Sequence, residues 1–153
     1  MKSSRAVRNS PRYGRHVAIT GLAALGVTVA MANPAAASPA DGVTGTILGQ
    51  TSIGGTDYIL REITIAPGGS TGWHFHDGFV YGVVRSGVLS HYKADCALDG
   101  VYHAGESLVE NASPDYVHIG RNSGSEPLVL DVLYTLPSHS PLSEDAPAPE
   151  CAQ

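Results

Sequence analysis

The sequence predicts an all-β protein with a single domain, either a β-sandwich or a β-barrel. About eight to ten short apolar or alternating segments are separated by Gly, Pro, Asn and Asp residues roughly every eight to twelve positions. No segment carries a helical period of apolar residues. The 153 residues are enough for one domain of this kind.

The first 37 residues resemble a secretory signal peptide and are set apart from this domain. A basic head without acidic residues precedes an apolar run at 17–32 and small residues before Ala37. The run is shorter than the ~20 residues that span a bilayer. We expect cleavage near Ala37 and a secreted, extracellular protein that is not attached to a membrane. An uncleaved membrane anchor is the alternative.

Cleavage changes the charge of the chain. It removes five of the nine Lys and Arg residues and none of the 14 Asp and Glu residues, so the net charge moves from −5 to −10. A domain this acidic is not expected to bind nucleic acid through its phosphates, whereas its field favours cations.

The first half of the remaining chain contains an N-terminal region at 38–56 and the start of the domain. Residues 38–42 form a polar linker, and residues 43–53 alternate weakly as a first strand. Gly54-Gly55 predicts a turn. The clearest strand is 57–66, with alternating faces, and Pro67-Gly68-Gly69 is expected to break it before a histidine-bearing strand at 71–76.

The second half supplies the remaining strands. The expected ranges are 79–85, 88–94, 107–110, 116–121 and 128–136. The span 95–100 reads as a loop between them. We place the β-domain at 57–136, and the Pro- and acid-rich residues 137–153 form a tail that is either ordered by contact or disordered.

Histidines form the most informative pattern. His74 and His76 are two residues apart on an expected strand, so both imidazoles share one face, opposite Trp73 and Phe75. Two imidazoles on one face can bind a divalent metal. The pair alone equally describes two partly exposed histidines on a strand.

Two stretches together resemble the paired motifs of the cupin family. The first motif is a glycine, His-x-His and a hairpin-closing glycine, matched by Gly68, His74, His76 and Gly87. The second is a glycine, a proline-bearing turn, a histidine and an asparagine, matched by Gly105, Pro114, His118 and Asn122. The resemblance implies a single cupin jelly-roll β-barrel, also called a double-stranded β-helix. It also implies that His74, His76 and His118 bind one divalent ion of Fe, Mn, Ni, Cu or Zn.

The chain departs from the cupin pattern at one ligand position. Seven residues before Gly87, where the family has a glutamate, the sequence has Val80. The chain therefore resembles either a three-histidine cupin or a cupin that has lost its metal. If Val80 faces inward, Val84 shares its face, and with Phe79 or Tyr81 it shapes the pocket. Alternation along the strand places Tyr81 opposite Val80.

His91 is a further candidate. If Leu89 and His91 face the barrel, His91 stands in for the missing glutamate, but if Val88, Ser90 and Tyr92 face it, His91 lies on the surface. His103 and His139 are expected in solvent. Glu110 and Asp131 lie on expected strands, and we interpret them as solvated residues or hydrogen-bond partners more readily than as acid–base groups.

Two cysteines remain after the leader. Secretion places Cys96 and Cys151 in an oxidising environment, where an even count predicts a disulfide. Such a bond would stabilise the fold by about 4 kcal/mol. Two free thiols, with Cys151 on a disordered tail, are the alternative.

Two functions remain open at this stage. One is a secreted metal-dependent enzyme, for which the resemblance implies dioxygenase-type chemistry on a small organic substrate. The other is a non-catalytic extracellular module that binds a small ligand or a metal. The sequence carries no Gly-x-Ser-x-Gly elbow and no phosphate-binding loop. Cupins often dimerise, but nothing in the sequence specifies a homodimer.

Overall fold

The computed structural model describes residues 37–152, which fold into ten β-strands and one short 3-10 turn. The elements are β1 (Asp41–Ile53), β2 (Thr56–Ser70), β3 (His74–Phe75), β4 (Phe79–Ser86), β5 (Val88–Lys93), β6 (Leu98–His103), β7 (Ser107–Glu110), β8 (His118–Arg121), β9 (Leu128–Pro137), β10 (Glu144–Asp145) and the turn η1 (Glu150–Ala152). The prediction of an all-β fold is confirmed. The predicted signal peptide comprises residues 1–37, and all of them except Ala37 lie outside the described residues. Within residues 37–152 no helix is long and apolar enough to cross a membrane.

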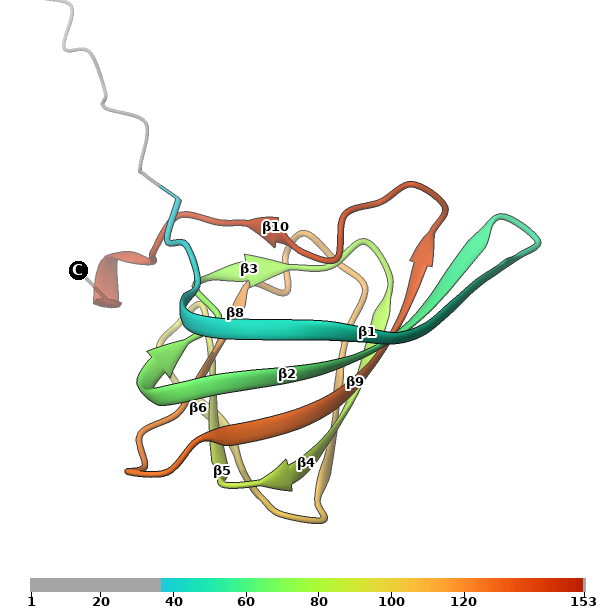
Figure 1. Cartoon of the computed structure of the whole chain (residues 1–153). Coiled ribbons are helices and arrows are strands. Elements are labelled where there is room, and N and C mark those ends of the chain that lie inside the picture. Colours follow the sequence, from blue (N-terminus) through green and yellow to red (C-terminus); the bar gives the residue numbers. More distant parts are fainter. Residues whose placement is uncertain (1–36, 153) are drawn as a thin grey trace, which may run out of the picture. The chain divides into compact units, whose positions relative to one another are not determined.

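The strands pair antiparallel in two layers that form a nearly closed barrel (Figure 1). One layer has the order β1-β2-β9-β4-β7, and the other has the order β10-β3-β8-β5-β6. They join where Ser70 at the end of β2 pairs with Arg121 at the end of β8. This is the jelly-roll arrangement, and it places β3, β7 and β8 around one interior.

Strict alternation along β9 fills the barrel. Leu128, Leu130, Val132, Tyr134 and Leu136 point inward and are buried, because successive side chains of a strand point to opposite faces. They pack against inward-facing residues of β2 and β4 in the main apolar cluster. Each fully buried aliphatic side chain contributes about 1.5–3 kcal/mol to stability. The cluster fills the interior beside the histidines.

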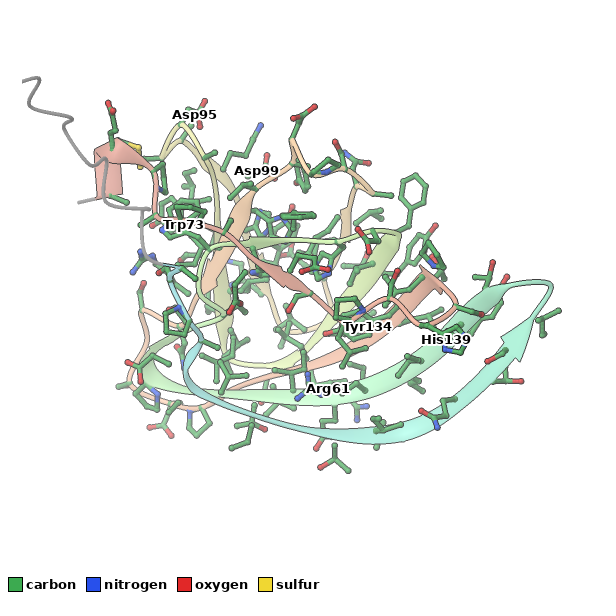
Figure 2. The ribbon with its side chains drawn as sticks, turned by 90° about the horizontal axis from the view of Figure 1, so that it is seen from above. Arg61, Trp73, Asp95, Asp99, Tyr134 and His139 are labelled. Carbon is green, nitrogen blue, oxygen red and sulfur yellow. A yellow bond between two sulfur atoms is a disulfide. The ribbon has the colours of Figure 1, made fainter. Side chains whose placement is uncertain are left out.

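The β1–β2 hairpin extends beyond the barrel (Figure 1). Its turn is Gly54-Gly55, as expected, and both residues have positive φ angles (61° and 83°) that suit a tight hairpin turn. Ser138 donates a backbone hydrogen bond to the Gly55 carbonyl at 2.9 Å. Figure 2 accordingly shows His139 at this end of the barrel, while Trp73 lies toward the C-terminal turn.

The expected break at Pro67-Gly68-Gly69 is wrong, because β2 continues to Ser70. Gly68 adopts a φ of 78°, which bends the strand without ending it. From the bend onward, the backbone also pairs with the second layer: Gly68 donates to the Asn122 carbonyl at 2.9 Å, while Ser70 still pairs with Asp41 of β1. The end of β2 therefore connects the two layers from this glycine onward.

Two further strands differ from expectation. The histidine-bearing strand is confined to His74–Phe75, because Gly72 has a φ of 73° that is incompatible with an extended strand. Residues 98–103, partly assigned to a loop, form β6. Asp99 and Gly100 are poor strand formers, but pairing with β5 overrides their preference.

Candidate metal centre

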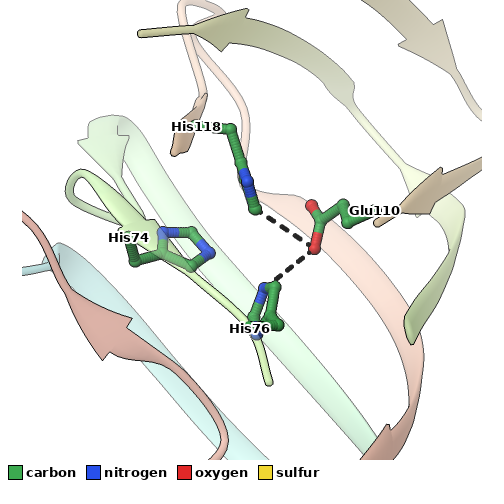
Figure 3. A group of neighbouring side chains, drawn as sticks. All are labelled: His74, His76, Glu110 and His118. Carbon is green, nitrogen blue, oxygen red and sulfur yellow. Dashed lines mark ion pairs between the residues drawn. The ribbon is translucent and has the colours of Figure 1, made fainter. Parts of the chain in front are cut away.

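The structure brings His74, His76 and His118 together (Figure 3). His74 lies on β3 and pairs directly with His118 at the start of β8. The centroid of the His118 ring lies 4.4 Å from that of His74 and 5.3 Å from that of His76. All three side chains are buried, and His118 has no exposed surface. Histidines from two separate sequence motifs therefore meet in the barrel interior.

The residues that alternate with His74 and His76 explain why both histidines point inward. Trp73 packs with Ile119 and Ala146 in a second apolar cluster, with Phe75 partly buried against it. Burial of these aromatic side chains on one side leaves His74 and His76 no other orientation. The predicted alternation of faces around His74 and His76 is confirmed.

Backbone carbonyls fix the orientation of each ring. Nδ1 lies 2.8 Å from the Gly72 oxygen in His74, 2.7 Å from the Leu142 oxygen in His76 and 2.8 Å from the Tyr116 oxygen in His118. A carbonyl oxygen only accepts, so in each ring Nδ1 carries the hydrogen and donates it. In the neutral rings Nε2 then bears a lone pair, which is the form that binds a metal.

A carboxylate completes the cluster. Glu110, the last residue of β7, places its Oε2 atom 3.0 Å from Nε2 of His76 and 3.4 Å from Nε2 of His118. The ligand atoms of the three histidines and Glu110 all lie within 4.8 Å of one another. The interpretation of Glu110 as a solvated residue is wrong, because its side chain is only 15% exposed and points to the histidines.

Strand register explains where this carboxylate comes from. Glu110 on β7 lies directly opposite Val80 on β4, the residue at the family's glutamate position. Side chains opposite each other in an antiparallel pair have Cβ atoms about 4.5–5.5 Å apart. The carboxylate thus reaches the same region of the barrel from the neighbouring strand. Val80 had suggested a site of three histidines without a carboxylate. The structure contradicts this expectation, because Glu110 lies among the histidines.

The donor set fits a cation. Nε2 of His76 and of His118 lies within ion-pair distance of Glu110, yet neither atom has a hydrogen-bond partner in the described structure. Buried polar atoms are normally satisfied, so these orphaned nitrogens require an explanation. Lone pairs that converge on a carboxylate oxygen repel one another unless a positive charge lies between them. Three imidazoles and one carboxylate suit a divalent transition metal.

Electrostatics keep two of the candidate ligands, His74 and Glu110, in their metal-binding forms. Burial, followed by the proximity of His118, lowers the pKa of His74 to about 3. Burial by itself would raise the pKa of Glu110, but the surrounding His118, His76 and His91 outweigh it and lower that pKa well below its usual range. At neutral pH His74 is neutral and Glu110 is ionised.

The candidate pocket residues have different fates. Val80, Val84 and His91 are buried and face the interior. Tyr81 does not line the pocket: it lies on the outer face of β4 and is 43% exposed. Its neighbours Val80 and Gly82 are buried, so alternation along β4 places Tyr81 on the outside of the barrel. His103 and His139 are exposed, as expected.

His91 faces the barrel beside the site, together with Leu89 on β5. Its Nε2 lies 3.5 Å from Oε1 of Glu110, and its ring centroid lies 4.9 Å from that of His118. Of the two alternatives for this strand, the one in which Leu89 and His91 face the barrel is therefore confirmed. His91 does not replace the missing glutamate within the four-residue cluster, because Glu110 takes that place.

The tail reaches the site. Cys96 and Cys151 form the expected disulfide, with an S–S distance of 2.06 Å. Upstream of it, β10 pairs with β3, and Ala146 donates a backbone hydrogen bond to Trp73 at 2.8 Å. The Leu142 carbonyl that orients His76 belongs to the same segment. The tail therefore helps to hold β3 with His74 and, directly after it, His76.

Among the comparisons with known proteins, only the comparison with solved structures finds similar proteins. No family model and no curated protein matches the sequence. The polyketide cyclase RemF from Streptomyces resistomycificus has a TM-score of 0.55 at 22% identity, over 72% of this chain and 72% of that chain. A cupin domain from Bordetella pertussis Tohama I has a TM-score of 0.51 at 20% identity, over 64% of this chain and 95% of that one.

A third solved structure points the same way. An oxalate oxidase in complex with glycolate has a TM-score of 0.52 at 22% identity, over 65% of this chain and 53% of that chain. A cupin superfamily protein from Desulfitobacterium hafniense also matches, with a TM-score of 0.51 at 14% identity. Likeness at these identities speaks for architecture and not for activity. With its jelly-roll topology and its two histidine stretches, the chain has the cupin fold.

Proposed function

We propose that the chain is a secreted, metal-dependent enzyme that carries out dioxygenase-type chemistry on a small organic molecule. The observation that supports it most is the convergence of three buried imidazoles and Glu110 with unpartnered Nε2 atoms. His74, His76, His118 and Glu110 would hold the ion. A bound iron, manganese, nickel or copper ion supplies Lewis acidity and redox chemistry with open coordination positions for substrate and oxygen.

The residues around the site have defined tasks in this proposal. The carbonyls of Gly72, Leu142 and Tyr116 keep each Nε2 directed at the ion. Val80, Val84 and Tyr134 form a buried wall that excludes water. Glu110 is the most exposed of the four candidate ligands, so a small substrate would approach from its side. Burial raises the pKa of Tyr134 to about 12, so its phenol stays protonated.

The burial of the three histidines favours a second candidate, a non-catalytic module that binds a metal or a small ligand. None of the three rings is more than 7% exposed, which leaves little surface for a large substrate. Catalytic turnover distinguishes the proposed enzyme from the binding module. A binding module retains its metal and consumes no oxygen with any substrate.

The test is oxygen consumption by protein loaded in turn with iron, manganese, nickel and copper, on a panel of small organic acids and diketones. We expect uptake with at least one metal and substrate, and none from His118→Ala prepared in the same way. Oxygen uptake that is equal in parent and variant would come from free metal and contradict the enzyme proposal. Metal retention without uptake would support the binding module.

Secretion has a separate test. Expression of the full chain in a secreting host, followed by mass spectrometry of the culture medium, gives the mature N-terminus. We expect a protein that begins near Ser38. Full-length protein that remains in the cells would contradict secretion and leave the metal site unaffected.

A further inference from the structure

A small cavity lies outside the barrel, on the outer face of the layer that contains β3, β8 and β5. Its volume is about 210 Å³, and we call it the outer cavity. Its lining consists of two aromatic side chains, one arginine, the disulfide and the last described residue: Trp73, Tyr92, Arg121, Cys96, Cys151 and Ala152. Figure 2 shows Trp73 near the C-terminal turn, at this end of the molecule.

Strand alternation separates the outer cavity from the candidate metal centre. Trp73 and Tyr92 each lie next to an inward-facing histidine in the chain, so their own side chains point to the outside of the layer. Arg121 pairs with Ser90 of β5, two residues before Tyr92, and therefore shares this outer face. The lining contains none of the candidate metal ligands. The outer cavity is thus a separate feature of the fold.

The C-terminal tail forms the rim of the outer cavity. Cys151 and Ala152 belong to η1, and the disulfide joins Cys151 to Cys96 in the loop after β5. A covalent bond therefore fixes the rim against the strand that carries Tyr92. A cavity with a fixed rim loses little conformational freedom when it takes up a ligand, which favours binding.

Arg121 supplies the outer cavity with a positive charge. Residues 37–152 contain four Lys and Arg residues against 14 Asp and Glu residues. Arg85 and Lys93 each pair with an aspartate, whereas Arg121 forms no ion pair in this part of the chain. No acidic side chain belongs to the lining. A guanidinium in such a place favours an anion, and it binds a carboxylate through two parallel hydrogen bonds.

The remaining walls indicate what should carry the carboxylate. Trp73 and Tyr92 offer aromatic surface, and the disulfide with Ala152 adds apolar surface. The volume lies below the ~300–1,000 Å³ of sites for drug-sized ligands, so a single ring is a suitable size. Phosphate or sulfate would find one basic side chain and no use for the aromatic walls.

We propose that the outer cavity is a binding site for a small monocyclic aromatic carboxylate. Its ring contacts Trp73 and Tyr92, and its carboxylate pairs with Arg121. This site does not depend on the proposed metal centre, and it should bind its ligand equally well in metal-free and metal-loaded protein.

The test is a titration of the protein with benzoate, followed by the fluorescence of Trp73, which is the only tryptophan of the chain. Excitation is at a wavelength that benzoate does not absorb. Benzamide keeps the ring without the charge, and acetate keeps the charge without the ring. With about nine non-hydrogen atoms, benzoate should bind with a dissociation constant on the order of 1 mM. Benzamide and acetate should each bind at least about tenfold more weakly.

Three variants locate the binding site. Arg121→Gln should weaken benzoate binding about 10- to 100-fold and abolish the preference for benzoate over benzamide, because the charged hydrogen bonds are lost. Arg121→Lys keeps the charge without the planar fork and should bind with intermediate affinity. Arg85→Gln changes an exposed arginine outside the outer cavity and, as the matched control, should bind as the parent does.

Three results would overturn the proposal: no saturable fluorescence change with benzoate, equal binding of benzoate and benzamide, or parental binding by Arg121→Gln. Acetate binding as tight as that of benzoate would overturn the aromatic class of the ligand. If Arg121→Gln fails to fold, the comparison of the three ligands on the parent protein still decides.

Discussion

Glu110 brings a carboxylate to the three histidines from the strand beside Val80. The family's glutamate position holds Val80, yet a carboxylate reaches the histidines from the cross-strand neighbour of that position. Adjacent strands of an antiparallel pair bring opposite side chains to nearly the same point. The site therefore depends on where a carboxylate lies in space and not on which strand carries it.

Exchange of the two positions tests this at the residue scale. Glu110→Val should weaken metal binding by at least about tenfold, because it removes the only carboxylate among the candidate ligands. Adding Val80→Glu to that variant should recover most of the loss. Isothermal titration with Mn²⁺ or Co²⁺ measures both steps.

Glu106→Val, which alters a carboxylate outside the cluster, is the control and should bind as the parent does. Unchanged affinity in Glu110→Val would show that Glu110 is not a ligand. Failure of Val80→Glu to recover binding would show that β4 and β7 do not present the carboxylate equivalently.

At the scale of elements, β3 is the part of the site that depends most on pairing with other strands. It has two residues and pairs with β8 only through His74 and His118, so β10 of the tail supplies its other pairing. The disulfide Cys96–Cys151 fixes the far end of that tail. Metal binding and tail docking should therefore depend on each other.

Removal of residues 138–153 should weaken metal binding by about 10- to 100-fold, because His76 loses the Leu142 carbonyl that orients its ring. A milder change, Cys151→Ser, should lower affinity less and lower the free energy of unfolding by up to about 4 kcal/mol. Removal of only the residues after Cys151 is the control. Equal affinity in the parent and in the protein without residues 138–153 would separate the tail from the site.

Particular elements show what the sequence could predict and what it could not. Alternation predicted that His74 and His76 share one face and that Val80 and Val84 share another, whereas the inward direction of Val80 followed from the resemblance to cupins. Glu110 was missed because strand pairing between β4 and β7 is not visible in sequence. The one available signal was Leu108, an apolar residue two positions earlier on the same face. The start of β6 was missed because Asp99 and Gly100 are poor strand formers and predicted a loop.

At the scale of the whole molecule, the candidate ligands couple folding to pH. The pKa of His74 falls from an ordinary 6.5 to about 3 in the folded state, so the unfolded chain binds the proton more readily between these values. Stability is then fully present above pH 6.5 and decreases as the pH falls toward 3. The lowered pKa of Glu110 acts in the same direction below its ordinary 4.5.

Urea denaturation of the metal-free protein at pH 7, 5 and 4 checks this coupling. The midpoint should fall at each step, and His74→Gln should flatten the fall between pH 7 and 5. A midpoint that rises or stays constant as the pH falls would contradict the buried, neutral state of His74.

The measurement that tests the account most directly is the metal content of the protein, determined by mass spectrometry on residues 38–153 expressed without a polyhistidine tag. His74→Ala/His76→Ala serves as the paired variant. The account predicts close to one equivalent of a divalent transition metal in the parent and none in the variant, with both proteins folded. An absence of metal from the parent, even after reconstitution with each candidate ion, would contradict it.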